Sequence, residues 1–147
     1  MINYYVELAE ISNNVIGDKK SILNYETELF PLNQEEQNEL IKEIISKEEV
    51  KKMFPNADNV IITELIPTHM FLEKNNKTDN PLYETSKTNW NNTRASEKYQ
   101  KRRLQESYKE IINATKLIIE TTNNQNLQDS QDFLNFLDKL NKLSVSH

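Results

Sequence analysis

Residues 94–120, RASEKYQKRRLQESYKEIINATKLIIE, are the stretch from which we build the fold prediction. On a helix at roughly 100° per residue, one broad and mainly apolar sector contains Leu104, Tyr108, Ile111, Thr115, Ile118 and Ile119. A narrow basic stripe beside this sector contains Lys98, Arg102, Lys109 and Lys116. No Gly or Pro interrupts the run, and Thr93 or Ser96 can supply an N-cap oxygen. The pattern predicts a long amphipathic helix.

The basic stripe has two interpretations. It is either a solvated helix face whose long stems cover the edge of the core, or a track for phosphates or an acidic partner. In the second case Trp90, Tyr83 and Tyr99 are near enough in the sequence to stack on bases. Glu97, Glu106 and Glu110 on the same helix weaken the nucleic-acid version of this interpretation.

Charge is unevenly distributed along the chain. Residues 1–82 carry 8 Lys against 15 Asp and Glu, whereas residues 83–120 carry 8 Lys and Arg against 5 Glu. The formal net charge of the whole chain is −5, which argues against non-specific coating of nucleic acid. The acidic first half therefore suits a basic partner, while the basic helix suits an acidic one.

Length and composition narrow the class of protein. A chain of 147 residues is long enough for one hydrophobic core and short for two, so we predict a single domain over residues 1–147. The sequence has no Cys, which excludes disulfides and Cys-based zinc sites. We see neither a signal peptide after Met1 nor a run of about 18 apolar residues. We therefore expect a cytoplasmic protein without membrane spans.

Residues 1–73 predict a small antiparallel or mixed sheet in the order strand, strand, helix, strand. Residues 3–11 and 22–30 alternate polar and apolar side chains,. Turn residues between them favour a hairpin: Asn13, Asn14, Gly17 and Asp18. Residues 60–66 are expected to be the most buried strand, with residues 68–73 continuing it as an edge segment.

A helix is predicted between the second and third strands, because Asn33 and Glu36 have the spacing of a helix-capping pair,. Its break is expected near Ser46. Residues 74–92 are polar, Asn-rich and interrupted by Pro81, which predicts a long loop,.

Residues 93–143 are expected to form two helices. Asp129 or Ser130 caps the second, whose apolar face contains Phe133, Phe136, Leu137, Leu140 and Leu143,. The predicted fold class is α+β.

Candidate catalytic residues are few. The histidines are His69 and His147, and the spacing around them predicts neither a nucleophile–base pair nor a metal site. Glu7, Glu26 and Glu28 on neighbouring predicted strands form an acidic face. That face is either the solvated side of the hairpin or a pair of carboxylates for acid–base or magnesium chemistry. We predict no catalytic residue, no metal and no cofactor.

The leading functional hypothesis is a non-enzymatic protein-binding regulator or inhibitor. If the Gly-poor, Asn- and Lys-rich composition reflects a phage or mobile element of an AT-rich bacterium, the expected target is a host enzyme. The alternative is a nucleic-acid-binding accessory protein that uses the basic helix 94–116. The expected partner-binding residues are Arg94, Lys98, Lys101, Arg102, Arg103, Lys109, Trp90 and Tyr99.

A third hypothesis is an assembly or virion component. It predicts a homo-oligomer whose interface buries the apolar stripe of Tyr108, Ile111 and Ile118.

Overall fold

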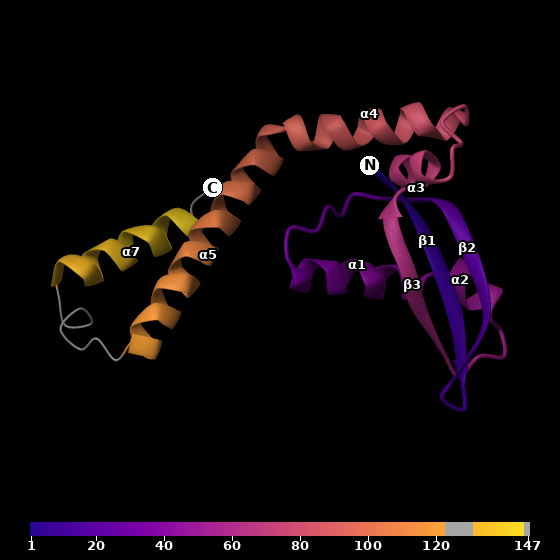
Figure 1. Ribbon diagram of the computed structural model, residues 1–147, viewed down its shortest axis with the longest axis horizontal. Helices are drawn as coiled ribbons and strands as arrows, with labels where there is room; N and C mark the ends of the chain where they lie inside the picture. The colour runs from indigo at the N-terminus through magenta and orange to yellow at the C-terminus, as the bar shows by residue number, and fades with distance from the viewer. Residues whose placement is uncertain (123–130, 146–147) are drawn as a thin grey trace. The chain divides into compact units, whose positions relative to one another are not determined.

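The computed structural model describes residues 1–122 and 131–145. Contacts divide the chain into two compact units, Met1–Arg94 and Ala95–His147. The first unit contains a three-stranded antiparallel sheet together with helices, and the described part of the second unit consists of two helices (Figure 1). The chain therefore has the predicted α+β class.

The strands are β1 (Ile2–Ser12), β2 (Val15–Thr27) and β3 (Asn59–Pro67). Their order in the sheet is β2-β1-β3, and β1 pairs antiparallel with both neighbours. The predicted hairpin is thereby confirmed. The expectation that residues 60–66 form the most buried strand is wrong, because β1 is central and β3 lies at an edge. Val6 and Leu8 of β1 are completely buried, whereas most side chains of β3 are half-buried.

The hairpin turn is shorter than predicted. Asn13 and Asn14 have φ angles of 54° and 62°, a left-handed conformation that Asn adopts more readily than most residues. Two consecutive residues with positive φ match a type I′ turn, whose twist suits a hairpin. β2 consequently begins at Val15 rather than at residue 22, and Gly17–Asp18 lies within the strand.

Two helices follow β2, α1 (Gln34–Ser46) and α2 (Glu48–Met53). The Asn33 side chain accepts a 2.8 Å hydrogen bond from the Glu36 backbone N–H. The Glu36 carboxylate in turn accepts a 2.9 Å bond from the N–H of Leu32, so the predicted capping at this helix start is confirmed. The predicted break is confirmed as well, because Lys47 has an extended ψ of 139°.

These helices are tied to one face of the sheet through β2. The hydroxyl of Tyr25 donates a 2.6 Å hydrogen bond to the carboxylate of Glu43 on α1. The Lys20 ammonium lies 5.2 Å from the centre of the Phe54 ring, and Phe54 is the residue that immediately follows α2. Leu40, Ile44 and Val50 supply the buried apolar side chains of the two helices.

The helices α3 (Thr68–Lys74) and α4 (Pro81–Ala95) complete the first unit. The Phe71 ring of α3 stacks on Tyr5 of β1, with centroids 3.6 Å apart. Asn89 of α4 donates a 2.9 Å hydrogen bond to the Asn3 side chain, which donates a 2.8 Å bond to Asn24. Both helices are therefore joined to the central strand by specific side-chain contacts.

Two predictions for this region are wrong. Residues 68–73 form helix α3 rather than an edge strand, and most of the expected loop 74–92 is α4. Pro81 occupies the first position of α4, where a missing N–H costs no hydrogen bond. The Asn80 side chain accepts a 3.0 Å bond from the Leu82 N–H. Asn-rich segments have low helix propensity. In α4 the hydrogen bond of Asn89 to the sheet helps to offset this low propensity.

The second unit contains α5 (Glu97–Thr122) and α7 (Gln131–Val145), which contact each other. Ser96 caps α5 by accepting a 3.2 Å bond from the Tyr99 N–H, as predicted. Ile112 and Ile119 of α5 are buried. Asp129 and Ser130, the expected caps of the last helix, lie outside the described residues. Within the described ranges, none of the helices is long and apolar enough to cross a membrane.

Candidate protein-binding surface

The predicted basic residues are distributed over two helices. Arg94 lies in the last turn of α4, because the helix is interrupted at Ser96 before α5 begins. The others all lie on α5: Lys98, Lys101, Arg102, Arg103 and Lys109. Helical periodicity gathers Lys98, Lys101 and Arg102 within one turn, whereas Lys109 stands two turns further along. We call the cluster of Lys98, Lys101 and Arg102 the basic surface.

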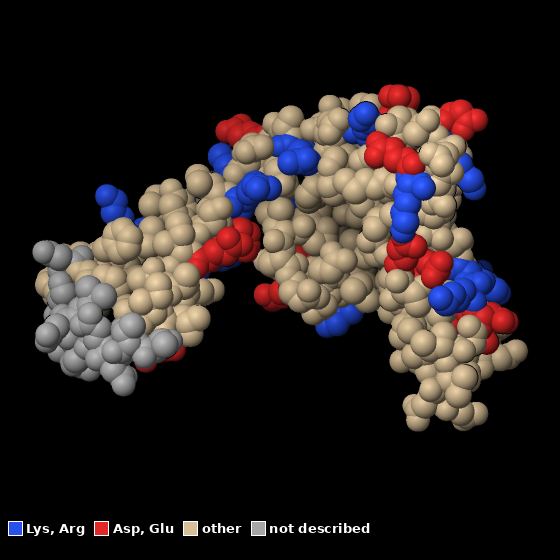
Figure 2. Space-filling view, viewed as in Figure 1, with Lys and Arg blue, Asp and Glu red and all other residues tan. Residues whose placement is uncertain are grey.

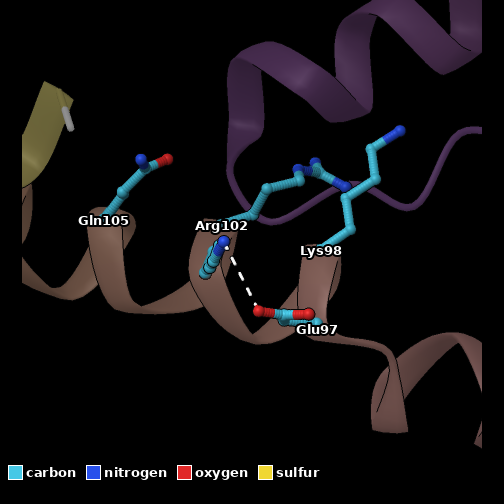
Figure 3. A pocket seen from close by; sticks show the side chains of 5 residues that line it. Glu97, Lys98, Arg102 and Gln105 are labelled. Carbon is cyan, nitrogen blue, oxygen red and sulfur yellow. Dashed lines mark ion pairs between the residues drawn. The ribbon is translucent and has the colours of Figure 1, made fainter. Parts of the chain in front are cut away.

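The basic surface lines an open pocket together with Glu97 and Gln105. Figure 3 shows the side chains of Lys98, Arg102 and Gln105 extending to the same side of α5. The carboxylate of Glu97 lies apart from them and pairs with Lys101 at 3.5 Å. Two cationic heads and an amide are thus presented together, with a carboxylate at the margin.

Carboxylates accompany the cations in the first half of α5. Besides the Glu97–Lys101 pair, Lys109 lies 3.6 Å from Glu106. Both lysine side chains are more than half exposed, so each pair contributes little to stability. Figure 2 likewise shows Lys and Arg intermixed with Asp and Glu over this face of the molecule. The surface is therefore of mixed charge rather than uniformly basic.

Tyr99 is not a side chain that a base could stack on. Its exposed fraction is 5%, and its hydroxyl accepts a 3.2 Å hydrogen bond from the Arg103 guanidinium. Arg103 is accordingly held along the helix by Tyr99. We do not include Tyr99 in the candidate surface.

Trp90 is likewise engaged in packing. Its ring lies 4.4 Å from Phe30 and 5.7 Å from His69, measured between centroids. Phe30 follows β2 and His69 belongs to α3, so Trp90 connects α4 with two other segments of the first unit. The stacking role expected for Trp90 does not fit these contacts.

The expected acidic face is divided along the sheet. Glu26 pairs with Asn3 at one end of β1, whereas Glu7 pairs with Ser21 near its middle. Glu28 follows the end of β2. The alternative in which Glu7 forms a carboxylate pair with Glu26 or Glu28 is therefore wrong, because the strand register separates these residues.

The carboxylate opposite Glu7 comes from a different strand. Glu7 lies across from Glu64 of β3, and two like charges in such positions repel. Lys19 lies 3.7 Å from Glu7 and Lys74 lies 3.5 Å from Glu64, while Thr63 donates a 2.7 Å hydrogen bond to Glu7. These cations and the hydroxyl offset the repulsion, which favours a solvated structural role for Glu7.

A contact between a serine and a histidine was not predicted from the sequence. The Oγ of Ser86 lies 2.8 Å from Nδ1 of His69 and accepts a 2.9 Å hydrogen bond from its backbone N–H. Ser86 is 2% exposed and His69 is 5% exposed, so substrate does not reach either group. Burial lowers the pKa of His69. The pair joins α3 to α4. Its two residues are 17 positions apart in the sequence, and no sequence pattern indicated that they would be in contact.

The described part of the chain has no cluster of metal-ligating side chains. Across residues 1–122 and 131–145, no three His, Asp or Glu side chains are grouped so as to hold a metal ion. His147 lies outside these residues.

No protein-family model matches the chain, and no curated protein or solved structure matches it either.

Proposed function

We propose that this chain is a non-enzymatic protein-binding regulator that binds an acidic partner through the basic surface of α5. The observation that carries the proposal is the presentation of Lys98 and Arg102, with Gln105, on one side of α5 around an open pocket. Arg and Lys side chains placed together recognise carboxylates on a partner through charge-assisted hydrogen bonds.

A protein partner is preferred to a nucleic acid for two reasons. The aromatic residues expected to stack on bases, Trp90 and Tyr99, are packed or buried. In addition, Glu97 and Glu106 stand beside the cations and would repel a phosphate backbone. A protein surface that is acidic overall but also carries some basic side chains is complementary to such a mixture.

The regulatory role, the cytoplasmic location and a host enzyme as target belong to the same proposal. The absence of Cys supports the cytoplasmic location, and the Gly-poor, Asn- and Lys-rich composition supports a host enzyme as the target. The burial of Ser86 and His69 supports the non-enzymatic part, because a nucleophile must be reached by its substrate.

The experiment is a pull-down from bacterial lysate with nuclease, washed at about 50 and about 200 mM salt, the range over which phosphate-driven binding collapses. Wild type is compared with Lys98→Glu/Arg102→Glu. The matched control is Lys139→Glu/Lys142→Glu on α7, which makes the same change in net charge on exposed residues of the same unit. We expect one protein to be retained by wild type and control, and reduced at least about tenfold, or roughly 1.4 kcal/mol, by the α5 variant.

Capture of the same proteins by the α5 variant and wild type would refute the basic surface as the binding site. Recovery of nucleic acid that is lost at the higher salt, without a retained protein, would replace the proposal by the nucleic-acid alternative.

A further inference from the structure

α7 packs on α5 along a seam whose residues recur at intervals of seven. Ile112 and Ile119 of this seam are 4% and 6% exposed, and α7 is the helix of the second unit that contacts α5. The same spacing, continued toward the start of α5, reaches Gln105 and Lys98. The seam is therefore apolar and buried in the second half of α5, and polar in the first half.

α7 is too short to cover the whole seam. α5 has 26 residues and α7 has 15, so the two helices are about 39 and about 22 Å long at 1.5 Å per residue. About 17 Å of α5 consequently extends beyond α7. Because α7 packs where Ile112 and Ile119 lie (Figure 1), the part of the seam that it does not reach is in the first half of α5.

Four residues in this first half have the spacing of a helix-packing hole. When two helices pack, a side chain of one inserts between residues i, i+3, i+4 and i+7 of the other. Lys98, Lys101, Arg102 and Gln105 have this spacing, and with Glu97 they line the open pocket; we call these four residues the α5 hole. The corresponding four positions in the buried part of the seam are Ile112, Thr115, Lys116 and Ile119.

The lining of the α5 hole decides which kind of side chain fits it. The pocket is lined by three cations and one carboxylate, a formal net charge of +2. Lys101 lies 3.5 Å from Glu97, whereas the side chains of Lys98, Arg102 and Gln105 extend to one side of α5 (Figure 3). Two cations and an amide are complementary to a carboxylate. An apolar side chain would remove these groups from water without offering an acceptor.

We propose that the acidic partner of the basic surface is an α-helix that lies along α5 as a continuation of α7 and inserts carboxylate side chains at the α5 hole. This inference rests on the proposed function, because it names the shape and the chemistry of the partner. A helix is favoured over an extended segment because the hole continues a seam on which α5 already packs a helix. Its carboxylates belong on one helix face, at intervals of three and four residues.

Two synthetic peptides test the helical partner. Both are alanine- and glutamine-rich, contain three glutamates and have about 20 residues, the length at which such helices form in water. The one-face peptide has its glutamates at i, i+4 and i+7, and the scattered peptide has them at i, i+5 and i+10, roughly 140° apart. Circular dichroism checks that both peptides are equally helical.

Binding is followed by the amide chemical shifts of the isotope-labelled full chain with up to about 1 mM peptide, which detects a millimolar Kd. We expect the one-face peptide to shift amides of residues 97–105 and to bind at least about fivefold more tightly than the scattered peptide, since only its glutamates reach the hole together.

Gln105→Glu tests the hole itself. It adds a carboxylate to the lining, so it should weaken binding of the one-face peptide about tenfold. The matched control is Gln100→Glu, the same change at an exposed residue of α5 outside the hole, which should leave the affinity unchanged. Lys98→Glu/Arg102→Glu should lose the one-face peptide and instead bind its counterpart with lysines in place of the glutamates, a rescue that an unfolded variant would not show.

Equal binding of the one-face and scattered peptides, no binding of the one-face peptide, or equal effects of the two glutamine substitutions overturns the proposal. The pull-down judges the proposed function separately, because an extended acidic partner would also depend on Lys98 and Arg102. A partner retained there, together with equal binding of the two peptides, refutes the helix and leaves the proposed function standing. Failure of both experiments refutes both.

Discussion

The hydroxyl oxygen of Ser86 lies between the backbone N–H of His69, at 2.9 Å, and the Nδ1 of the same residue, at 2.8 Å. The oxygen accepts from the backbone N–H, and it forms a second hydrogen bond with Nδ1 whose direction is set by the tautomer of the imidazole,. One buried side chain thereby satisfies two polar atoms at the start of α3.

We predict that Ser86→Ala destabilises the first unit by about 1–3 kcal/mol, because it leaves buried polar atoms without partners. Urea unfolding followed by the fluorescence of Trp90, the single tryptophan, measures the loss in this unit. The control is Thr85→Ala, an exposed position on the same helix whose hydroxyl bonds to the Pro81 carbonyl at 3.5 Å. Equal effects of the two substitutions would contradict the structural role of Ser86.

We predict that acid destabilises the fold through His69. Burial holds the pKa of His69 below the ordinary value of 6.5; the charge of Glu73 opposes this shift and that of Lys87 adds to it. As the pH falls below 6.5, the unfolded chain binds a proton that the folded chain does not bind until its lower pKa, so stability decreases. The urea concentration at the unfolding midpoint should therefore be lower at about pH 5.5 than at about pH 7, two values on either side of the unperturbed histidine pKa.

His69→Asn separates this effect from the titration of carboxylates. The amide oxygen of asparagine can accept the Ser86 hydrogen bond but does not titrate in this range. The variant should show a smaller loss of stability over the same pH interval, and an unchanged loss would rule out His69 as the titrating group.

We predict energetic coupling between Tyr25 and Glu43. The Tyr25 hydroxyl donates a 2.6 Å hydrogen bond to Glu43, and Thr27 donates one of 3.3 Å to the other carboxylate oxygen. Burial, followed by the hydrogen bond and the charge of Glu43, raises the pKa of Tyr25 above its ordinary value of 10, so the phenol stays a donor. A double-mutant cycle of Tyr25→Phe and Glu43→Gln, measured by urea unfolding, should give a coupling energy of about 0.5–3 kcal/mol. If the stability effects of the two substitutions simply added, the two side chains would not be coupled.

We predict that Asn3→Ala weakens the attachment of α4 to the sheet. Asn3 is 2% exposed and bonds to both Asn24 and Asn89, so its removal should cost about 1–3 kcal/mol. Hydrogen exchange of the α4 amides should become faster than in the control Asn38→Ala, an exposed residue of α1. Unchanged exchange in α4 would show that other contacts hold the helix.

Local sequence patterns predicted those features that depend on residues only a few positions apart. The Asn33–Glu36 capping, the break near Ser46 and the Ser96 cap are such cases, because hydrogen bonds between near neighbours form them. α4 was missed because its polar composition suggests a loop, although Pro81 after Asn80 is a start signal for a helix.

The sequence by itself determined the α+β class, the hairpin and the amphipathic helix, since alternation and helical periodicity record which side of each segment is apolar. Only the tertiary structure decided which of those sides are covered. It paired Glu7 with Glu64 rather than with Glu26, and it buried Tyr99. It also covered Ile112 but left Ile111 at the surface. Register and helix packing depend on contacts between distant segments, and no local pattern encodes them.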